Sequence, residues 1–180
     1  MKCLKDLLGG FGRGSCSSED PNDFKTWYNK GVSSLNEGDF AEAVSNFDRS
    51  LELDPKSVRA WNNKGISLLS MSKYSDAIKC MDRAIELDPH HAFYWYNKGI
   101  CQDKLGHTDQ AIRSFDKAIE ISPKFAEARF NKAMALESKG NRQAAIETWK
   151  DYLKVATNNK RQKEWLPKAM ERLEKLMNEQ

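Results

Sequence analysis

The side chains that could do acid–base, nucleophilic or metal chemistry are few in this chain and lie far apart. Its 180 residues include three histidines and four cysteines. None of them has the spacing of a zinc site such as HExxH or paired CxxC. No phosphate loop, GxSxG turn or dinucleotide fingerprint occurs. The sequence therefore predicts no catalytic residues, no metal site and no cofactor, and we do not expect an enzyme.

The strongest pattern is W-x-N-K-G, which begins at Trp27, Trp61 and Trp95 and so recurs every 34 residues. A looser copy begins at Arg129, again 34 residues further on. Other residues recur in the same register, namely Ala43, Ala77, Ala111 and Ala145, Phe47, Met81, Phe115 and Trp149, and Pro55, Pro89 and Pro123. A fixed period of this size indicates stacked repeats, which mainly build an extended surface.

With Trp, Gly, Ala, an aromatic residue and Pro at these offsets, residues 24–156 resemble the tetratricopeptide repeat (TPR) family. The resemblance implies an all-α fold, a right-handed α–α superhelix (TPR solenoid) of four helix-turn-helix repeats plus a C-terminal capping helix. We expect a flexible N-terminal segment at 1–22 and a TPR domain at 23–180. Within this domain we expect repeats at 24–57, 58–91, 92–125 and 126–159.

Each repeat is expected to hold two helices, A and B, joined by a tight turn. The expected pairs are 24–37 with 40–53, 58–71 with 74–87, 92–105 with 108–121, and 126–139 with 142–156. Gly38, Gly106 and Gly140 lie where a left-handed residue ends helix A. Ser72 occupies this place in the second repeat, so we expect that turn to be strained or different.

The two ends of the chain leave alternatives open. Residues 162–179 carry an apolar stripe at helical spacing and are expected to form the capping helix, or else a dimerisation surface. Pro167 fits only in the first turn of that helix. The Gly- and Ser-rich segment 1–22 is either a disordered tail or an anchor that docks on a groove or a partner, because its apolar residues Leu4, Leu7, Leu8 and Phe11 share one helical face.

The recurrent spacing also separates packing residues from surface residues within each repeat. The Trp residues and Gly31, Gly65 and Gly99 are interpreted as packing positions, because a glycine lets two helices approach closely. Cys101 is interpreted likewise, since its equivalents are Ser33, Ser67 and Ala135. Recurrent carboxylates such as Glu52 are expected to be solvated. The sequence assigns no role to the Lys before each Gly.

In the TPR superhelix the A helices line a concave groove, where we expect the functional surface. The candidate peptide-binding residues are Tyr28, Asn29, Asn62, Asn63, Ile66, Phe93, Tyr96, Asn97, Ile100, Phe130 and Asn131. Amides can bond a peptide backbone, and aromatic side chains are frequent anchors of recognition. The Asn residues have a second interpretation, which is that they bridge neighbouring repeats.

Some TPR domains hold acidic chaperone tails with a clamp of Lys, Arg and Asn side chains that binds two carboxylates. The corresponding residues here are Tyr28, Val32, Asn63, Phe93 and Asn97, of which only Asn63 matches the family's pattern. We therefore expect no carboxylate clamp.

The sequence predicts a non-catalytic interaction module that binds a peptide or a protein segment in the concave groove, as an adaptor or scaffold. Self-association through the capping helix or the N-terminal segment is one alternative. Nucleic-acid binding is another, because 10 Lys/Arg stand against 6 Asp/Glu from Lys139 onward. The net charge of +3 is too small to favour it. No apolar run is long enough to span a membrane, and four unpaired cysteines suit the cytoplasm.

Overall fold

The computed structural model describes residue 20 and residues 22–157, 159 and 162–178. Within this part of the chain it contains α-helices and no strands, in agreement with the all-α prediction. The predicted N-terminal segment, including Cys3 and Cys16, lies almost entirely outside the described residues.

The helices follow the predicted helix limits closely. They are α1 (Phe24–Glu37), α2 (Phe40–Leu53), α3 (Val58–Ser70), α4 (Tyr74–Leu87), α5 (Ala92–Lys104), α6 (Thr108–Ile121), α7 (Ala126–Ser138), α8 (Arg142–Ala156) and α9 (Leu166–Asn178). Each of the first eight begins where the pattern predicts and ends within one residue of it. The helix α9 begins later than the expected residue 162, because Gln162 and Trp165 lie in a turn whose Trp165 N–H donates to the Gln162 carbonyl at 3.0 Å.

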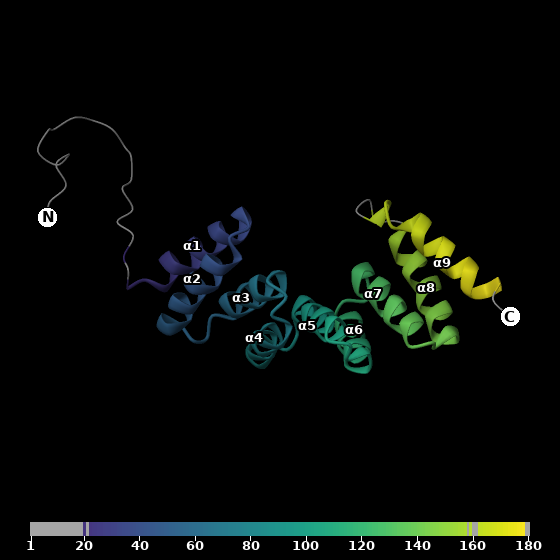
Figure 1. Ribbon diagram of the computed structural model, residues 1–180, viewed down its shortest axis with the longest axis horizontal. Coiled ribbons are helices and arrows are strands. Elements are labelled where there is room, and N and C mark those ends of the chain that lie inside the picture. Colours follow the sequence, from purple (N-terminus) through teal and green to yellow (C-terminus); the bar gives the residue numbers. More distant parts are fainter. Residues whose placement is uncertain (1–19, 21, 158, 160–161, 179–180) are drawn as a thin grey trace, which may run out of the picture.

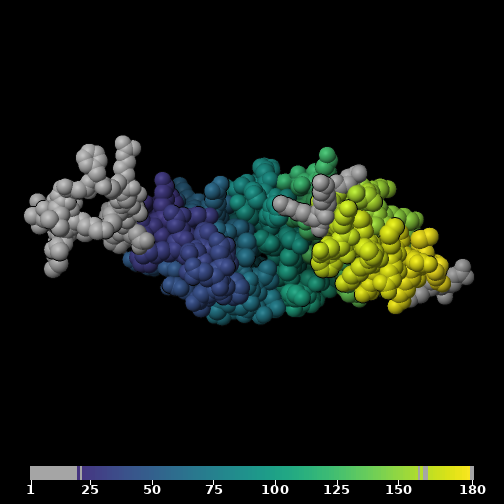
Figure 2. Space-filling view, turned by 90° about the horizontal axis from the view of Figure 1, so that it is seen from above, coloured from purple at the N-terminus to yellow at the C-terminus, as the bar shows by residue number. Residues whose placement is uncertain are grey.

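Each helix packs against the next along the chain, and the A helices α1, α3, α5 and α7 also contact one another in succession. Figure 1 shows the resulting arc, with α1 and α9 at opposite ends. In the space-filling view the helices follow in sequence order along an elongated body (Figure 2). The described part of the chain is therefore a solenoid in which one row of A helices forms a continuous face.

Within each repeat, helices A and B touch at a glycine. A Cβ atom added to Gly99 would lie 2.6 Å from Cε1 of Phe115, and one added to Gly31 would lie 2.6 Å from Cε1 of Phe47. Both phenylalanines are buried, so the ring occupies the space that a side chain on helix A would need. The predicted packing role of these glycines is thus explained by a ring lying directly against the helix backbone.

The second and fourth repeats relax this contact. The nearest atom to a Cβ on Gly65 is Cε of Met81, also at 2.6 Å, which is the free end of a flexible side chain. In the fourth repeat Ala133 stands at the same position, packed in a core cluster with Trp149. The shape of the residue on helix B therefore decides whether helix A can carry a methyl group.

We expect Gly99→Ala to destabilise the protein more than Gly65→Ala. Alanine gains about 1 kcal/mol of helix propensity over glycine at either site. At Gly99 the Phe115 ring must move, and overpacking of this kind costs about 1–3 kcal/mol. At Gly65 the flexible Met81 side chain can change rotamer, so the main clash is relieved and only the contact with Cys80 Cβ at 3.2 Å remains, which makes the loss smaller than at Gly99. Urea unfolding followed by helical circular dichroism measures both; an equal loss of stability in the two variants would contradict the explanation.

The A–B turns use one left-handed residue each. The backbone φ is +84° at Gly38 and +77° at both Gly106 and Gly140, and Ser72 adopts φ +60° in the remaining turn. In all four, two N–H groups after the helix bond back to its last carbonyls, as Ser72 N does to Leu69 O at 2.9 Å. The expectation of strain at Ser72 is confirmed, because a residue with a Cβ is held in a conformation that favours glycine.

Ser72→Gly is expected to raise the free energy of unfolding. The left-handed conformation costs a residue with a Cβ about 1–2 kcal/mol, and added backbone freedom in the unfolded chain offsets about half of the gain. We expect a net stabilisation of about 0.5–1 kcal/mol, measured by urea unfolding. Gly106→Ser is the matched reverse change and should destabilise; the explanation fails if both substitutions shift stability in the same direction.

The lysine of W-x-N-K-G joins neighbouring repeats. Lys64 Nζ lies 2.5 Å from Asp48, and the equivalent pairs Lys98–Asp82 and Lys132–Asp116 are each 2.6 Å apart. Each pair links an A helix to helix B of the preceding repeat. The ammonium groups of Lys64 and Lys98 also lie 5.5 Å from the ring centroids of the Trp that opens their own motif. The lysine thus has a structural role that the sequence pattern alone did not reveal.

The tryptophans fix the loops between repeats. The indole N–H of Trp61 donates to the Pro55 carbonyl at 2.9 Å, and that of Trp95 donates to the Pro89 carbonyl at 3.1 Å. In the fourth repeat the guanidinium of Arg129 donates instead to the Phe125 carbonyl at 3.4 Å. The predicted structural role of Trp61 and Trp95 therefore includes a hydrogen bond to the preceding loop.

Candidate functional site

All predicted groove residues lie on the A helices, and the structure brings seven of them together in two groups, whereas Asn29, Ile66, Phe93 and Ile100 belong to neither. The first group forms a row of amides and a phenol across α1, α3 and α5. The second group gathers at the far end of the row of A helices, between α5, α7 and the turn before α9. Their exposure differs as well: Asn29 and Phe93 are exposed, and the rest are half-buried, namely Tyr28, Asn62, Asn63, Ile66, Tyr96, Asn97, Ile100, Phe130 and Asn131.

The first group is linked by two hydrogen bonds between neighbouring repeats and one within α3. Asn63 Nδ2 donates to the Tyr28 hydroxyl at 3.2 Å, and Asn62 Nδ2 donates to Asn63 Oδ1 at 3.2 Å. Asn97 Nδ2 then donates to Asn62 Oδ1 at 3.4 Å. These bonds correspond to the bridging interpretation of the Asn residues. They also hold the amides in fixed orientations along the groove.

The second group surrounds a pocket of about 250 Å³, which we name the aromatic pocket. It is lined by Tyr96, Glu127, Phe130, Asn131, Gln162 and Trp165. Three of these residues, Tyr96, Phe130 and Asn131, were predicted from the sequence. The structure brings them together with Glu127, Gln162 and Trp165, which are not among the candidate peptide-binding residues.

Aromatic contacts hold the walls of this pocket. The Phe130 ring is edge-on to Trp149 at 5.0 Å, to Tyr152 at 5.4 Å and to Trp165 at 5.4 Å between centroids. Trp149 and Tyr152 are fully buried, whereas Trp165 is 46% exposed. Phe130 therefore joins the core of the last repeat to the open wall, and Trp165 presents its ring to solvent.

The polar side of the pocket is a chain of hydrogen bonds. Gln162 Nε2 donates to Glu127 Oε1 at 2.7 Å, and the buried Tyr152 hydroxyl donates to Gln162 Oε1 at 3.1 Å. Asn131 Nδ2 donates to the Tyr96 hydroxyl at 3.0 Å. Burial raises the pKa of the Tyr96 phenol, and the charge of Glu127 raises that pKa further. Tyr96 therefore keeps its proton at neutral pH and can still donate it to a ligand.

Gln162 and Trp165, which sequence reasoning missed, belong to a continuation of the repeat register past the fourth repeat. Trp165 lies 34 residues after Asn131, so it takes the ladder position of a further A helix. The bond from Gln162 to Glu127 spans 35 residues, as do the bonds from Asn63 to Tyr28 and from Asn131 to Tyr96. Trp165 was interpreted only as part of the apolar stripe of the capping helix. Extending the 34-residue register past the fourth repeat would have placed it in the groove.

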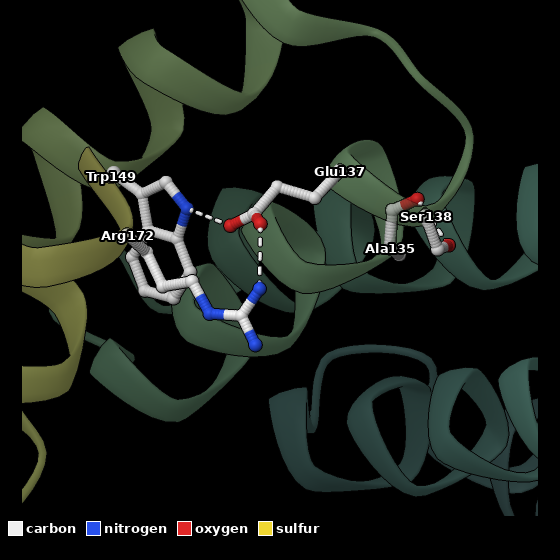
Figure 3. Close-up of polar contacts among 5 residues, drawn as sticks. All are labelled: Ala135, Glu137, Ser138, Trp149 and Arg172. Carbon is white, nitrogen blue, oxygen red and sulfur yellow. Dashed lines mark hydrogen bonds and ion pairs between the residues drawn. The ribbon is translucent and has the colours of Figure 1, made fainter. Parts of the chain in front are cut away.

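A buried carboxylate fixes α9 against the last repeat. Glu137 on α7 accepts a hydrogen bond from the Trp149 indole N–H of α8 at 2.5 Å, and Arg172 of α9 lies 3.2 Å from its other oxygen (Figure 3). The Glu137 side chain is only 14% exposed. One side chain thus ties three helices together and holds in place the helix that follows the Trp165 wall.

Glu137→Ala is expected to lower the free energy of unfolding by about 1–3 kcal/mol, because it leaves the Trp149 indole N–H buried without an acceptor. Arg172→Ala removes only the ion pair, whose Arg side chain is 39% exposed, and should cost less than about 1 kcal/mol. Urea unfolding of the two variants tests this order. A larger loss from Arg172→Ala would show that the ion pair, and not the indole bond, fixes α9.

The side chains that could take part in catalysis or metal binding do not come together in the described part of the chain. Burial raises the pKa of the Cys80 and Cys101 thiols to about 11, so both stay protonated and unreactive. The His91 ring stacks on Tyr94 with centroids 4.2 Å apart. Among the described residues no group of three His, Cys, Asp or Glu side chains could hold a metal ion. None of the described helices is long and apolar enough to cross a membrane.

Comparison with known proteins agrees with this architecture. Sequence profiles described as tetratricopeptide repeat match residues 24–57, 46–79, 64–135 and 126–159. A search of curated proteins finds no match. Among solved structures, MamA is similar at 29% identity and a TM-score of 0.74, over 76% of this chain and 80% of that one.

Two further solved structures are similar in fold. YrrB, described as a TPR protein with an unusual peptide-binding site, is 20% identical, with a TM-score of 0.68 over 85% of this chain and 88% of that one. The first TPR of Spaghetti (RPAP3), bound to the HSP90 peptide SRMEEVD, is 16% identical, with a TM-score of 0.64 over 67% of this chain and 96% of that one. At these identities the likeness concerns the fold alone.

The repeated A–B pairs, the glycine contacts and the concave row of A helices define an α–α superhelix of the interaction-module class. With the profile matches across residues 24–159, the chain belongs to the tetratricopeptide repeat family.

Proposed function

We propose that this protein binds a segment of a partner protein in the groove lined by α1, α3, α5 and α7, reversibly and without a chemical step. It would act as an adaptor or scaffold. The observation that carries the proposal is the aromatic pocket, in which a half-exposed tryptophan faces two other rings beside fixed polar groups. Such exposed aromatic surface in a concave site is typical of recognition.

The amide row supports binding of a peptide backbone along the same groove. An amide side chain has two N–H donors and a carbonyl that can accept two hydrogen bonds. The bonds between Asn62, Asn63 and Asn97 use only part of this capacity. Because these bonds already fix the amides, a ligand would order few side chains on binding, which favours affinity.

The similar structures support the proposal at the level of fold. YrrB has a peptide-binding site, and the RPAP3 repeat binds an HSP90 peptide. The proposal does not extend to acidic chaperone tails, because the clamp positions hold Tyr28, Val32, Phe93 and Asn97 in place of the expected side chains. A cytoplasmic setting suits the unpaired, buried thiols of Cys80 and Cys101.

Trp165→Ala is expected to weaken peptide binding at least tenfold while the helical circular dichroism is unchanged. Truncation of an aromatic anchor typically removes 2 kcal/mol or more of binding free energy. Trp165 is the better test residue than Phe130, because Phe130 also contacts the buried Trp149 and Tyr152. The probe is a library of random twelve-residue peptides displayed on phage and selected on the full-length chain, with affinities then measured by fluorescence anisotropy.

The matched control is Met170→Ala. Met170 is 59% exposed on α9 but does not line the aromatic pocket, so its removal should leave binding unchanged. The acidic peptide SRMEEVD serves as a negative probe. Selected peptides that bind Trp165→Ala as tightly as the original protein would contradict the proposed site, and tight binding of SRMEEVD would contradict the absence of a clamp.

A further inference from the structure

We propose that the aromatic pocket takes a cationic side chain, arginine or lysine, from the bound segment. This inference rests on the proposed function, since it names the chemistry of the ligand in the same groove. It goes further because it fixes the charge of the anchor and the direction in which the segment lies. Three observations carry it.

The first observation is a cation that the chain itself places on these rings. Lys168 Nζ lies 5.9 Å from the Phe130 centroid and 5.7 Å from the Trp165 centroid. A positive charge within about 6 Å of an aromatic face is attracted by the negative potential of that face. The walls of the pocket therefore already provide surfaces that hold a cation.

The second observation is a carboxylate fixed among the same residues. Glu127 lines the pocket and is held by Gln162, which is itself 4% exposed and bonded to Tyr152. The bond from Gln162 goes to Oε1, and a carboxylate can accept about four hydrogen bonds over its two oxygens. A guanidinium or ammonium group between Glu127 and the rings would meet both a fixed anion and aromatic faces.

The third observation is a change of charge along the groove. The same position of the four successive A helices is occupied by Lys25, Arg59, Phe93 and Glu127. The cations lie toward α1 and the anion lies at the aromatic pocket, with the exposed Phe93 between them. A segment with a basic anchor at the pocket and an acidic end toward Lys25 and Arg59 would match this order, whereas the reverse orientation would oppose like charges.

An apolar anchor is the competing possibility, and the structure separates the two. An aliphatic or aromatic side chain in the pocket would gain nothing from Glu127 and would be indifferent to the charge of Lys168. A cationic anchor gains from Glu127 and is repelled by Lys168, which already lies over Phe130 and Trp165. A cationic anchor is therefore identified when removal of the Glu127 charge weakens binding and removal of the Lys168 charge strengthens it.

The test uses full-length protein and peptides chosen in the selection described above. We expect the selected peptides to share one arginine or lysine. In peptides with an arginine anchor, replacing the arginine by citrulline, its neutral isostere, should weaken binding about tenfold. Glu127→Gln should weaken the arginine peptide about tenfold but change the citrulline peptide less than about twofold. Lys168→Met, which keeps most of the side-chain stem, should strengthen the arginine peptide several-fold.

The outcomes distinguish this inference from the proposed function. Peptides that depend on Trp165 but carry an apolar anchor, and that bind Glu127→Gln unchanged, would overturn the cationic pocket and leave the groove-binding function standing. Peptides indifferent to Trp165→Ala, or no selected peptide at all, would contradict both. We expect Glu127→Gln to stay folded, because glutamine still offers Gln162 an acceptor. Thermal unfolding followed by circular dichroism checks this.

Discussion

The close contact of two helices within each repeat is the constraint on which this structure depends. The Phe47 and Phe115 rings lie where a side chain on Gly31 or Gly99 would project, so the helix axes can approach and the ring is sealed from water. The glycine side of each A helix is therefore turned toward helix B. The other side is left for the groove, where Asn63 bonds to Tyr28 of the preceding repeat.

Much of the fold was predictable because the packing positions recur in register. The glycines, the aromatic residues and the prolines predicted the limits of the first eight helices to within one residue, and the exception at Ser72 was visible as a missing glycine. The Lys64–Asp48 pair was not predicted, although both residues recur every 34 positions. A pattern on one helix does not show its partner on another until the helices are placed in space.

The candidate site was only half predictable for a related reason. Tyr96, Phe130 and Asn131 follow from the position of the groove in the repeat. Two further residues of the aromatic pocket, Gln162 and Trp165, lie in a turn outside the four repeats. Their role depends on how α9 is held against the last repeat, and that depends on contacts such as the indole bond to a buried carboxylate. The apolar spacing of α9 reveals neither the position of Trp165 nor these contacts, and only the 34-residue register points to Trp165.

The constant spacing of the contacts between repeats has a consequence for how such a protein can change in evolution. The first two junctions use the same elements, a Trp bond to the preceding loop and a Lys–Asp pair, as at Trp61 and Lys64. Duplication of one 34-residue unit ahead of Tyr96 would reproduce a complete junction on both of its sides. The groove would grow longer while the pocket at its end, built from later residues, stayed intact. Length and end chemistry can therefore vary independently of each other.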